Sequence, residues 1–358
     1  MSLKMDYNYL GDTGMKVSNL CFGALTFGIV DDSVARPGQL NEADSHLLLD
    51  RYVEWGGNFI DTADVYADGL SEKIVGSWLS KHNRNEFVVA TKVRFNTNPK
   101  DVNSIGLSRK HIMAGIESSL KNLQTSYIDI YQTHCWDVGT PIKETLLTLH
   151  DLQRAGKIHY VGLSNVCGWQ IQKIVDVAKD IGMLPIASLQ QQYSLLERHS
   201  EFEEFQVCLN EGIGVLPWSP LKGGFLSGKF KRDEMPSPET RIGFTALEEQ
   251  KRVLQSQPAW TILKEKDAAW ELLDIMKDIA TVHGKSVAQV ALRWLIQKKI
   301  VSSVIFGAKT LQQLDDNLGA SSGWELTEEE MQKLDEISKP KAEYPHVMIS
   351  KVNVVRQK

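Results

Sequence analysis

Eight short, mostly apolar runs recur along this chain, and segments with helical periodicity separate most of them. Strands that alternate with helices predict a parallel sheet, and strands without a polar face predict a sheet that is covered on both sides. Eight such units fit an α/β fold with a closed (β/α)8 barrel, the TIM barrel. The runs are Leu20–Phe22, Asn58–Ile60, Phe87–Ala90, Ile128–Tyr131, Tyr160–Leu163, Ala187–Leu189, Gly214–Leu216 and Ser303–Phe306.

Segments between and after these runs carry capping signals of helix N-termini. Ser108 and Ser71 each precede an apolar pattern with steps of three and four residues. Ser286 and Thr327 are each followed three residues later by Gln or Glu, which matches the capping box. We therefore expect a helix to begin directly after each of these residues.

The spacing of the runs predicts additions to a plain barrel. Tyr9–Val17, with two glycines near its centre, predicts a β-hairpin before the first strand. Seven runs follow at regular intervals, but the interval before the last run is long and rich in Pro and Gly. It predicts an insertion of loops and helices after strand 7, with helices around Leu272–Val282 and Ser286–Gln297.

After the last run, Thr327–Ser338 predicts one extra C-terminal helix. We expect a single domain over residues 1–358, with the barrel at about 19–320 and the C-terminal helix and tail at 321–358. A doubly wound sheet is the alternative fold. To bind a dinucleotide, that fold needs G-x-G-x-x-G after its first strand, and Gly23–Gly28 does not match this pattern.

Composition and charge disfavour several classes of protein. The 358 residues are 42% hydrophobic and carry a net charge of −5, which disfavours disorder and nucleic-acid binding. No apolar stretch approaches the ~18 residues that suggest a membrane helix, and the N-terminus lacks an apolar signal segment. The cysteines are far apart and lack metal-type spacing, so we expect a cytoplasmic protein without a metal site. A homo-oligomer is compatible with these features.

Polar residues at the ends of the predicted strands are the candidates for chemistry, because the C-terminal ends of barrel strands carry the active site. Asp61, Lys92 and His134 follow three of the runs, and Tyr66 lies in the loop after Asp61. Each has a structural alternative, such as a loop cap for Asp61 or a rim aromatic for Tyr66. Together, an acid, a phenol, an amine and an imidazole at three strand ends would converge on one point.

Seven motifs, in order along nearly the whole chain, resemble the signatures of the aldo-keto reductase superfamily. Trp218 and Lys309 make the chain more similar to the branch of bacterial-type reductases and voltage-gated potassium-channel β subunits than to the aldose-reductase branch. The motifs are Asp61–Tyr66, Ala90–Lys92, Gln132–His134, Gly156–Asn165, Gln190–Leu196, Pro217–Leu221 and Gly307–Thr310.

This resemblance implies an NADPH-dependent enzyme that reduces an aldehyde or ketone to an alcohol, with Tyr66 as the proton donor. A free phenol has a pKa near ~10, so we expect a cationic Lys92 to lower the pKa of Tyr66 by roughly 1–3 units. Asp61 would keep Lys92 charged and oriented. His134 would hydrogen-bond the substrate oxygen and polarise the carbonyl group.

The resemblance also implies a nicotinamide site at the mouth of the barrel. Ser164, Asn165 and Gln190 offer hydroxyl and amide groups that suit a carboxamide, and Trp218 offers a flat face on which the ring can stack.

Cationic residues further along the chain suit the phosphates of the same cofactor. Lys229 and Arg241 fit the pyrophosphate, and Lys309 fits a 2′-phosphate near the start of a helix at Leu311–Leu318. The charge of Lys309 favours NADPH, with NADH as a weaker alternative. The full implied cofactor set is Gly23, Ser164, Asn165, Gln190, Trp218, Ser219, Pro220, Leu221, Lys229, Arg241, Gly307, Lys309, Gln313 and Asn317.

Aromatic residues in the predicted loops suggest an apolar substrate pocket formed by Phe27, Phe95 and Trp136. The sequence does not choose among small-molecule carbonyl substrates. A reductase-like regulatory or binding subunit, as in the potassium-channel β subunits, is the alternative function. The short segment before the hairpin and the complete set of four polar residues favour the enzyme.

Overall fold

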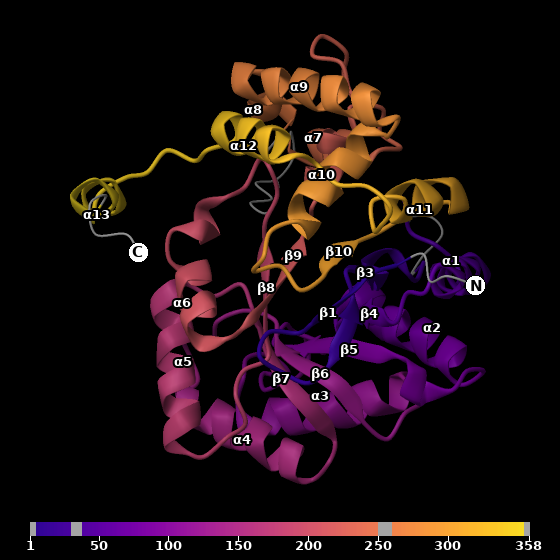
Figure 1. The fold of residues 1–358 in the computed structure, drawn as a ribbon. Coiled ribbons are helices and arrows are strands. Elements are labelled where there is room, and N and C mark those ends of the chain that lie inside the picture. The colour runs from indigo at the N-terminus through magenta and orange to yellow at the C-terminus, as the bar shows by residue number, and fades with distance from the viewer. Residues whose placement is uncertain (1–4, 30–37, 250–259, 354–358) are drawn as a thin grey trace.

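Figure 1 shows strands surrounded by helices, in a computed structural model that describes residues 5–29, 38–249 and 260–353. Residues 354–358 of the predicted tail lie outside these ranges. Eight strands form one parallel sheet in the order β10-β3-β4-β5-β6-β7-β8-β9, and each overlaps one predicted run. They are β3 (Leu20–Gly23), β4 (Phe59–Asp61), β5 (Val88–Val93), β6 (Ile128–Thr133), β7 (Ile158–Ser164), β8 (Ser188–Gln192), β9 (Gly214–Trp218) and β10 (Val304–Phe306).

The first and last strands of this sheet meet and close it into a barrel. Val215 in β9 forms a parallel bridge with Val301, just before β10. Its amide donates to the carbonyl oxygen of Ile300 (3.1 Å), and its carbonyl oxygen accepts from the amide of Ser302 (2.9 Å). The closed (β/α)8 barrel is therefore confirmed, and the doubly wound alternative is wrong.

Helices surround the barrel and cover the outer face of its strands (Figure 1). Six of them lie between consecutive strands from β3 to β9, and α10 and α11 flank β10. They are α1 (Glu42–Glu54), α2 (Leu70–Leu79), α3 (Arg109–Asn122), α4 (Ile142–Arg154), α5 (Gly168–Asp180), α6 (Glu204–Glu211), α10 (Val287–Ile296) and α11 (Leu311–Leu318). Short 3₁₀ turns also occur at η1 (Ala24–Thr26), η2 (Tyr66–Gly69), η3 (Arg84–Glu86), η4 (His199–Glu201) and η5 (Lys222–Ser227).

The predicted additions are present. The hairpin consists of β1 (Tyr7–Tyr9) and β2 (Lys16–Ser18), which pair antiparallel. The insertion after β9 contains α7 (Arg241–Glu249), α8 (Trp260–Lys264) and α9 (Asp267–His283), of which only α9 was expected.

Two helices follow the barrel. The extra helix α12 (Glu328–Ile337) is where the sequence predicts it. A further helix, α13 (His346–Asn353), was not predicted; its first residue, His346, stacks on Phe202 with 5.0 Å between ring centroids. Among the described residues, no helix has the length and apolar character needed to cross a membrane.

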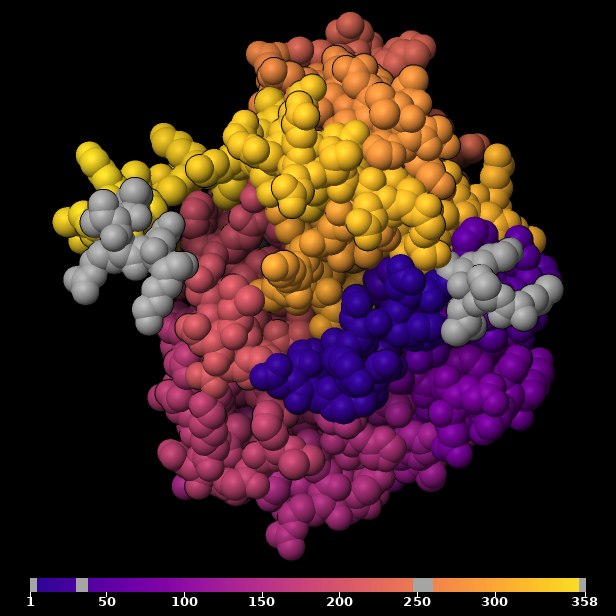
Figure 2. Space-filling model, viewed as in Figure 1, coloured from indigo at the N-terminus to yellow at the C-terminus, as the bar shows by residue number. Residues whose placement is uncertain are grey.

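The barrel contains a small core of its own, separate from the larger core between barrel and helices. Inward-facing residues such as Cys21, Ala90 and Leu216 are fully buried there, together with Leu10 and Val17 of the hairpin region. The N-terminal segment, indigo in Figure 2, lies across the end of the barrel next to this small core. Because the hairpin contributes apolar side chains to the barrel interior, it closes one end of it and leaves the other end for the site.

The caps confirm three of the four predicted helix starts. The side chains of Ser108, Ser286 and Thr327 each accept a hydrogen bond from the backbone three residues later. The prediction for Ser71 is wrong: α2 begins at Leu70, one residue before Ser71. Ser71 Oγ instead donates to the carbonyl oxygen of Ala24 (2.7 Å), so a tertiary contact uses the hydroxyl that the local pattern assigned to a cap.

A glycine in α2 gives a test of how closely the helices pack. Helix propensity alone predicts that Gly76→Ala stabilises α2 by roughly 1 kcal/mol. A Cβ at Gly76, however, would lie 2.1 Å from the carbonyl oxygen of Asn122 at the end of α3. We therefore expect Gly76→Ala to destabilise the protein by about 1–3 kcal/mol, measured as the free energy of unfolding in urea.

The control is Lys73→Ala, which changes an exposed side chain of the same helix and should leave stability nearly unchanged. A Gly76→Ala protein as stable as the wild type would show that α2 and α3 are not in this close contact.

Candidate active site

Four predicted residues meet at the C-terminal ends of β4, β5 and β6. Asp61 ends β4, Lys92 lies near the end of β5, His134 directly follows β6, and Tyr66 begins η2. Lys92 Nζ donates to Asp61 Oδ2 (2.6 Å), to the carbonyl oxygen of Thr62 (2.7 Å) and to the Tyr66 hydroxyl (3.2 Å). The three hydrogens of the ammonium therefore have three oxygen partners, one of which is the phenol.

Burial and charge set the protonation of this cluster. Lys92 is 0% exposed, and burial by itself favours the neutral amine. The Asp61 carboxylate and the Tyr66 hydroxyl outweigh that effect, so the pKa of Lys92 is raised and the ammonium form persists. The expectation that Asp61 keeps Lys92 charged agrees with this direction.

The expected lowering of the Tyr66 pKa is wrong for this structure. Burial of the phenol raises the pKa of Tyr66, and the opposing effect of Lys92 does not overcome it. Tyr66 therefore keeps its proton at neutral pH. The charge of Lys92 is visible in the sequence, whereas the cost of ionising a phenol that the fold removes from water is not.

His134 is neutral for the same physical reason. Burial, with the nearby cations Lys92 and Arg94, lowers the pKa of His134 to about 2. Its Nδ1 is buried and has no hydrogen-bond partner among the described residues, so we assign the proton to Nε2. The ring lies edge-on to Tyr66 (5.8 Å between centroids) and to Phe95 (4.6 Å).

Two glutamines complete the surroundings of Asp61, and the sequence analysis missed the role of one of them. Gln132 Nε2 and Gln190 Nε2 both donate to Asp61 Oδ1, at 3.0 and 2.7 Å. Gln190, which was expected to bind the nicotinamide carboxamide, thus donates a hydrogen bond to the Asp61 carboxylate. Gln132 is fully buried in β6, directly beside Lys92 in β5. A polar residue inside a buried strand was the signal that could have identified it.

A cavity of about 760 Å³ opens next to these residues, within the usual size range of small-molecule sites. Asp61, Tyr66 and His134 reach it, whereas Lys92 lies behind Tyr66 and Asp61. Thirteen of the fourteen predicted cofactor residues line it, and so does Phe95 of the predicted pocket. The thirteen are Gly23, Asn165, Gln190, Trp218, Ser219, Pro220, Leu221, Lys229, Arg241, Gly307, Lys309, Gln313 and Asn317.

Three predicted residues lie elsewhere. Ser164 is 1% exposed, and its hydroxyl accepts a hydrogen bond from Asn165 Nδ2. Phe27 is fully buried and packs against Phe22 in the main core. Trp136 is not among the residues that line the cavity; it packs against Trp169. The expectations for Phe27 and Trp136 as pocket walls are therefore wrong: Phe27 lies in the core, and Trp136 packs against Trp169 of α5.

Cations gather at one part of the cavity. Among the described residues, neither Lys229 nor Lys309 has a carboxylate within ion-pair distance, and Arg241 lines the same space. Partial desolvation, and then the Lys309 ammonium, lower the pKa of Lys229. Two lysines that repel each other without an acidic partner form a region suited to a polyanion.

Aromatic and amide groups lie between the cations and the four polar residues. The indole Nε1 of Trp218 donates to Asn165 Oδ1 (3.2 Å), which fixes the ring at the cavity wall. Asn165 Nδ2 in turn donates to the carbonyl oxygen of His134 (2.8 Å). This link connects the expected stacking face with the backbone of His134.

The cavity also has walls that the sequence analysis did not assign. Some are glycines or apolar residues of loops, for which sequence pattern gives no signal. They include Leu25, Thr26, Gly38, Cys135, Gly223, Gly224, Ser227, Glu239, Thr240, Ala288, Ile305, Phe306, Ala308 and Asp316.

Comparison with known proteins agrees with the geometry. A sequence model of the aldo/keto reductase family matches residues 19–339. The chain belongs to the aldo/keto reductase family. It is therefore an oxidoreductase of the carbonyl-reductase type, in a family that generally uses NAD(P)H.

Three relatives illustrate the range of the family. An uncharacterized oxidoreductase, YrpG, of Bacillus subtilis is 33% identical over 88% of this chain and 91% of its own length. Versiconal hemiacetal acetate reductase of Aspergillus parasiticus is 31% identical over 95% of this chain and 99% of its own. A probable voltage-gated potassium channel subunit beta of Arabidopsis thaliana is 34% identical over 88% and 91%.

The residues of the cavity fit a dinucleotide. The fit rests on the donor set: ammonium groups without a carboxylate partner in the described part of the chain for phosphates, a fixed indole face for a ring, and amide side chains for a carboxamide. Thr310 caps α11, so that the N-terminus of this helix lies beside Lys309.

Asp64, two residues before Tyr66, carries an unusual carboxyl group. It is 8% exposed, and neither side-chain oxygen has a hydrogen-bond partner among the described residues. Burial, and then the Glu72 carboxylate, raise the pKa of Asp64 to about 8. The folded protein therefore holds this proton more tightly than the unfolded chain, in which the pKa is near ~3.9.

This shift predicts a pH-dependent gain from Asp64→Asn. Because the folded state binds the extra proton between about pH 4 and 8, the wild type loses stability from this group as pH rises through that window. We expect the melting temperature of Asp64→Asn to exceed that of the wild type by an amount that grows up to about pH 8 and then levels. Asp68→Asn, at an exposed aspartate of the same loop, should show no such trend; a constant difference for Asp64→Asn would contradict the assignment.

Proposed function

We propose that this protein reduces an aldehyde or ketone to an alcohol with NADPH, using Tyr66 as the proton donor. The observation that carries the proposal is the contact of the buried, charged Lys92 with both Asp61 and the Tyr66 hydroxyl, at the wall of a cavity whose lysines, Lys229 and Lys309, have no carboxylate partner among the described residues. The free thiols of all four cysteines support a reducing compartment such as the cytoplasm.

When bound, the nicotinamide supplies a hydride to the carbonyl carbon. Negative charge then develops on the carbonyl oxygen, and the protein must neutralise it. Tyr66 keeps its proton at neutral pH and can donate it to that oxygen. Lys92, 3.2 Å from the hydroxyl, stabilises the phenolate that remains.

Neutral His134 has a complementary part. With its proton on Nε2, the imidazole can donate a hydrogen bond to the substrate oxygen and orient the carbonyl toward Tyr66. Lys92 and Arg94 would repel a cationic imidazole, so the position of His134 beside them favours its neutral form. Phe95, packed against this ring, offers an apolar surface to the substrate.

We assign NADPH rather than NADH on charge. A 2′-phosphate carries close to two negative charges, and Lys309 lies beside the N-terminus of α11 with no carboxylate partner among the described residues. Lys229 and Arg241 would hold the pyrophosphate, and Trp218 would stack on the nicotinamide.

The alternative is a regulatory subunit, and the Arabidopsis relative carries such a name. All four polar residues of the proposed reaction are present and lie together, which favours catalysis. They are Asp61, Tyr66, Lys92 and His134. The two functions differ in one respect: only the enzyme requires the Tyr66 proton.

Removal of the Tyr66 hydroxyl tests the reaction. We expect Tyr66→Phe to keep NADPH affinity but to lower kcat for any accepted aldehyde by at least ~100-fold, because a general acid contributes about 10²–10⁴ in rate. Lys92→Met should act on the same step, so the double variant should lose little more than Tyr66→Phe alone.

The matched control is Tyr9→Phe, which removes a hydroxyl from an exposed tyrosine of the hairpin and should leave kcat unchanged. Steady-state kinetics and cofactor titration suffice. A Tyr66→Phe protein with most of the wild-type rate would remove Tyr66 from its role.

Removal of the Lys309 charge tests cofactor choice. We expect Lys309→Ala to weaken NADPH about 10-fold or more, since a charge-assisted contact contributes ~1.5–3 kcal/mol, and to leave NADH nearly unchanged. The loss should shrink at high salt because the side chain is exposed. Titration of both cofactors at two ionic strengths measures it, with Lys81→Ala as an exposed control; equal losses for NADH and NADPH would place Lys309 away from a 2′-phosphate.

A further inference from the structure

The segment after β9 that lines the cavity contains a buried lysine, Lys222, whose side chain does not line the cavity. Leu221, Gly223 and Gly224 line the cavity, whereas Lys222 between them does not. Its side chain is 4% exposed, and its Nζ donates to Glu197 Oε2 at 3.0 Å. A lysine is seldom buried to this extent without a specific partner.

We propose that the Glu197–Lys222 ion pair is a positioning device that holds the cavity-lining segment 221–229 in place and thereby slows release of the dinucleotide. The proposal rests on the proposed function, because it takes the cavity as the NADPH site. Lys222 is a positioning residue: it acts through Leu221, Gly223 and Gly224 and does not touch the cofactor.

The backbone of this segment needs such a restraint. Ser219 and Lys222 have φ values of +58° and +47°, and Gly223, Gly224 and Gly228 also have positive φ. A left-handed conformation is unfavourable for a residue with a side chain and persists where the surroundings enforce it. At Lys222 the ion pair is a contact that can do so.

Glu197 is well placed to be the fixed partner. Its amide donates to the carbonyl oxygen of Ser194 (2.9 Å), and its carbonyl oxygen accepts from the Ser194 amide (3.0 Å), which closes a tight turn. Its other carboxylate oxygen, Oε1, lies 3.0 Å from His199 Nδ1. Both oxygens of Glu197 are thus engaged, one within its own turn and one with Lys222.

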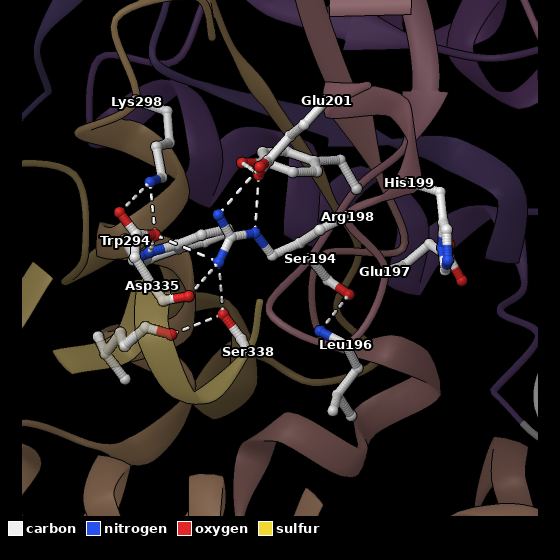
Figure 3. Close-up of polar contacts among 12 residues, drawn as sticks. Ser194, Leu196, Glu197, Arg198, His199, Glu201, Trp294, Lys298, Asp335 and Ser338 are labelled. Carbon is white, nitrogen blue, oxygen red and sulfur yellow. Dashed lines mark hydrogen bonds and ion pairs between the residues drawn. The ribbon is translucent and has the colours of Figure 1, made fainter. Parts of the chain in front are cut away.

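The next residue fastens this turn to the body of the protein, as Figure 3 shows. Arg198 is 8% exposed and forms two hydrogen bonds to Glu201, at 2.7 and 2.9 Å. Its third nitrogen donates to Ser338 Oγ and to the carbonyl oxygen of Asp335, both at 2.8 Å. The guanidinium also lies over the Trp294 ring, 5.3 Å from its centroid.

This cluster gives the extra C-terminal helix a function. Asp335, in α12, also binds Lys298 at 2.6 Å and accepts from Trp294 Nε1 at 2.9 Å. The turn that carries Glu197 is therefore fastened to α12 and α10. The rigid cluster around Arg198 and the ion pair to Lys222 form one continuous connection from α12 to the cavity.

The rate of cofactor dissociation tests whether the Glu197–Lys222 ion pair slows release. We expect Glu197→Gln to increase the dissociation rates of NADPH and NADH by about 10-fold each, the size of one lost charge-assisted hydrogen bond, with little change in association. Equal effects on both cofactors would distinguish this pair from Lys309. Lys222→Met should give a similar increase, and Lys222→Arg, which keeps the charge, should restore most of the wild-type rate.

The double variant Glu197→Gln/Lys222→Met shows whether the two residues act as one ion pair or have independent structural roles. If the residues act together, the double variant should release cofactor no faster than the faster single variant. Glu234→Gln removes the exposed partner of Lys231, a few residues further along, and should leave the rates unchanged.

Hydrogen exchange of the protein without cofactor gives a readout that does not depend on the proposed function. Amides of Gly224, Leu226 and Gly228, which hydrogen-bond within the segment, should exchange faster in Glu197→Gln than in the wild type or Glu234→Gln. Unchanged exchange and unchanged release in Glu197→Gln would overturn the proposal. A wild type that binds neither dinucleotide would refute the proposed function, while the exchange result would still decide whether the ion pair restrains the segment.

Discussion

The buried ion pair between Asp61 and Lys92 sets the conditions that the rest of the site satisfies. Removing a carboxylate and an ammonium from water costs several kcal/mol per ion, and the pair persists only with further hydrogen bonds. Thr62 and Tyr66 accept the remaining hydrogen bonds of the Lys92 ammonium, and Gln132 and Gln190 donate hydrogen bonds to the Asp61 carboxylate. The pair and its partners come from β4, β5, β6 and β8 and from the loop after β4, so a closed barrel is what brings them together.

The same burial that makes the pair costly gives the site its chemistry. Burial raises the pKa of Tyr66 and lowers the pKa of His134, so both side chains are neutral at the cavity wall, as the proposed proton donation and hydrogen bonding require. Lys92 remains the one cation of this group, next to the oxygen whose charge changes. The cations proposed for the cofactor lie apart from it: Lys229 follows η5, Arg241 begins α7 and Lys309 precedes α11.

Strands and loops divide the work within the protein. Strand ends supply the groups of the proposed proton transfer, and hydrogen bonds between strands fix their relative positions. Long loops and the segment 221–229 would supply the walls for cofactor and substrate, and the buried contact of Lys222 with Glu197 is the restraint proposed for that segment. The relatives carry names of different reductions and of a channel subunit on one family pattern, which agrees with variation in loops over a constant barrel.

The sequence by itself determined the barrel, its strands and the four polar residues of the site, because periodicity and strand-end position are local properties of the chain. It also determined the caps at Ser108, Ser286 and Thr327. It did not determine that Ser71 bonds Ala24, that Phe27 lies in the core, that Trp136 packs against Trp169, or that Gln132 supports Asp61, because these depend on which distant segments become neighbours. The pKa of Tyr66 was decided in the same way: the charge of Lys92 is visible in the sequence, whereas the burial that outweighs it exists only after the chain has folded.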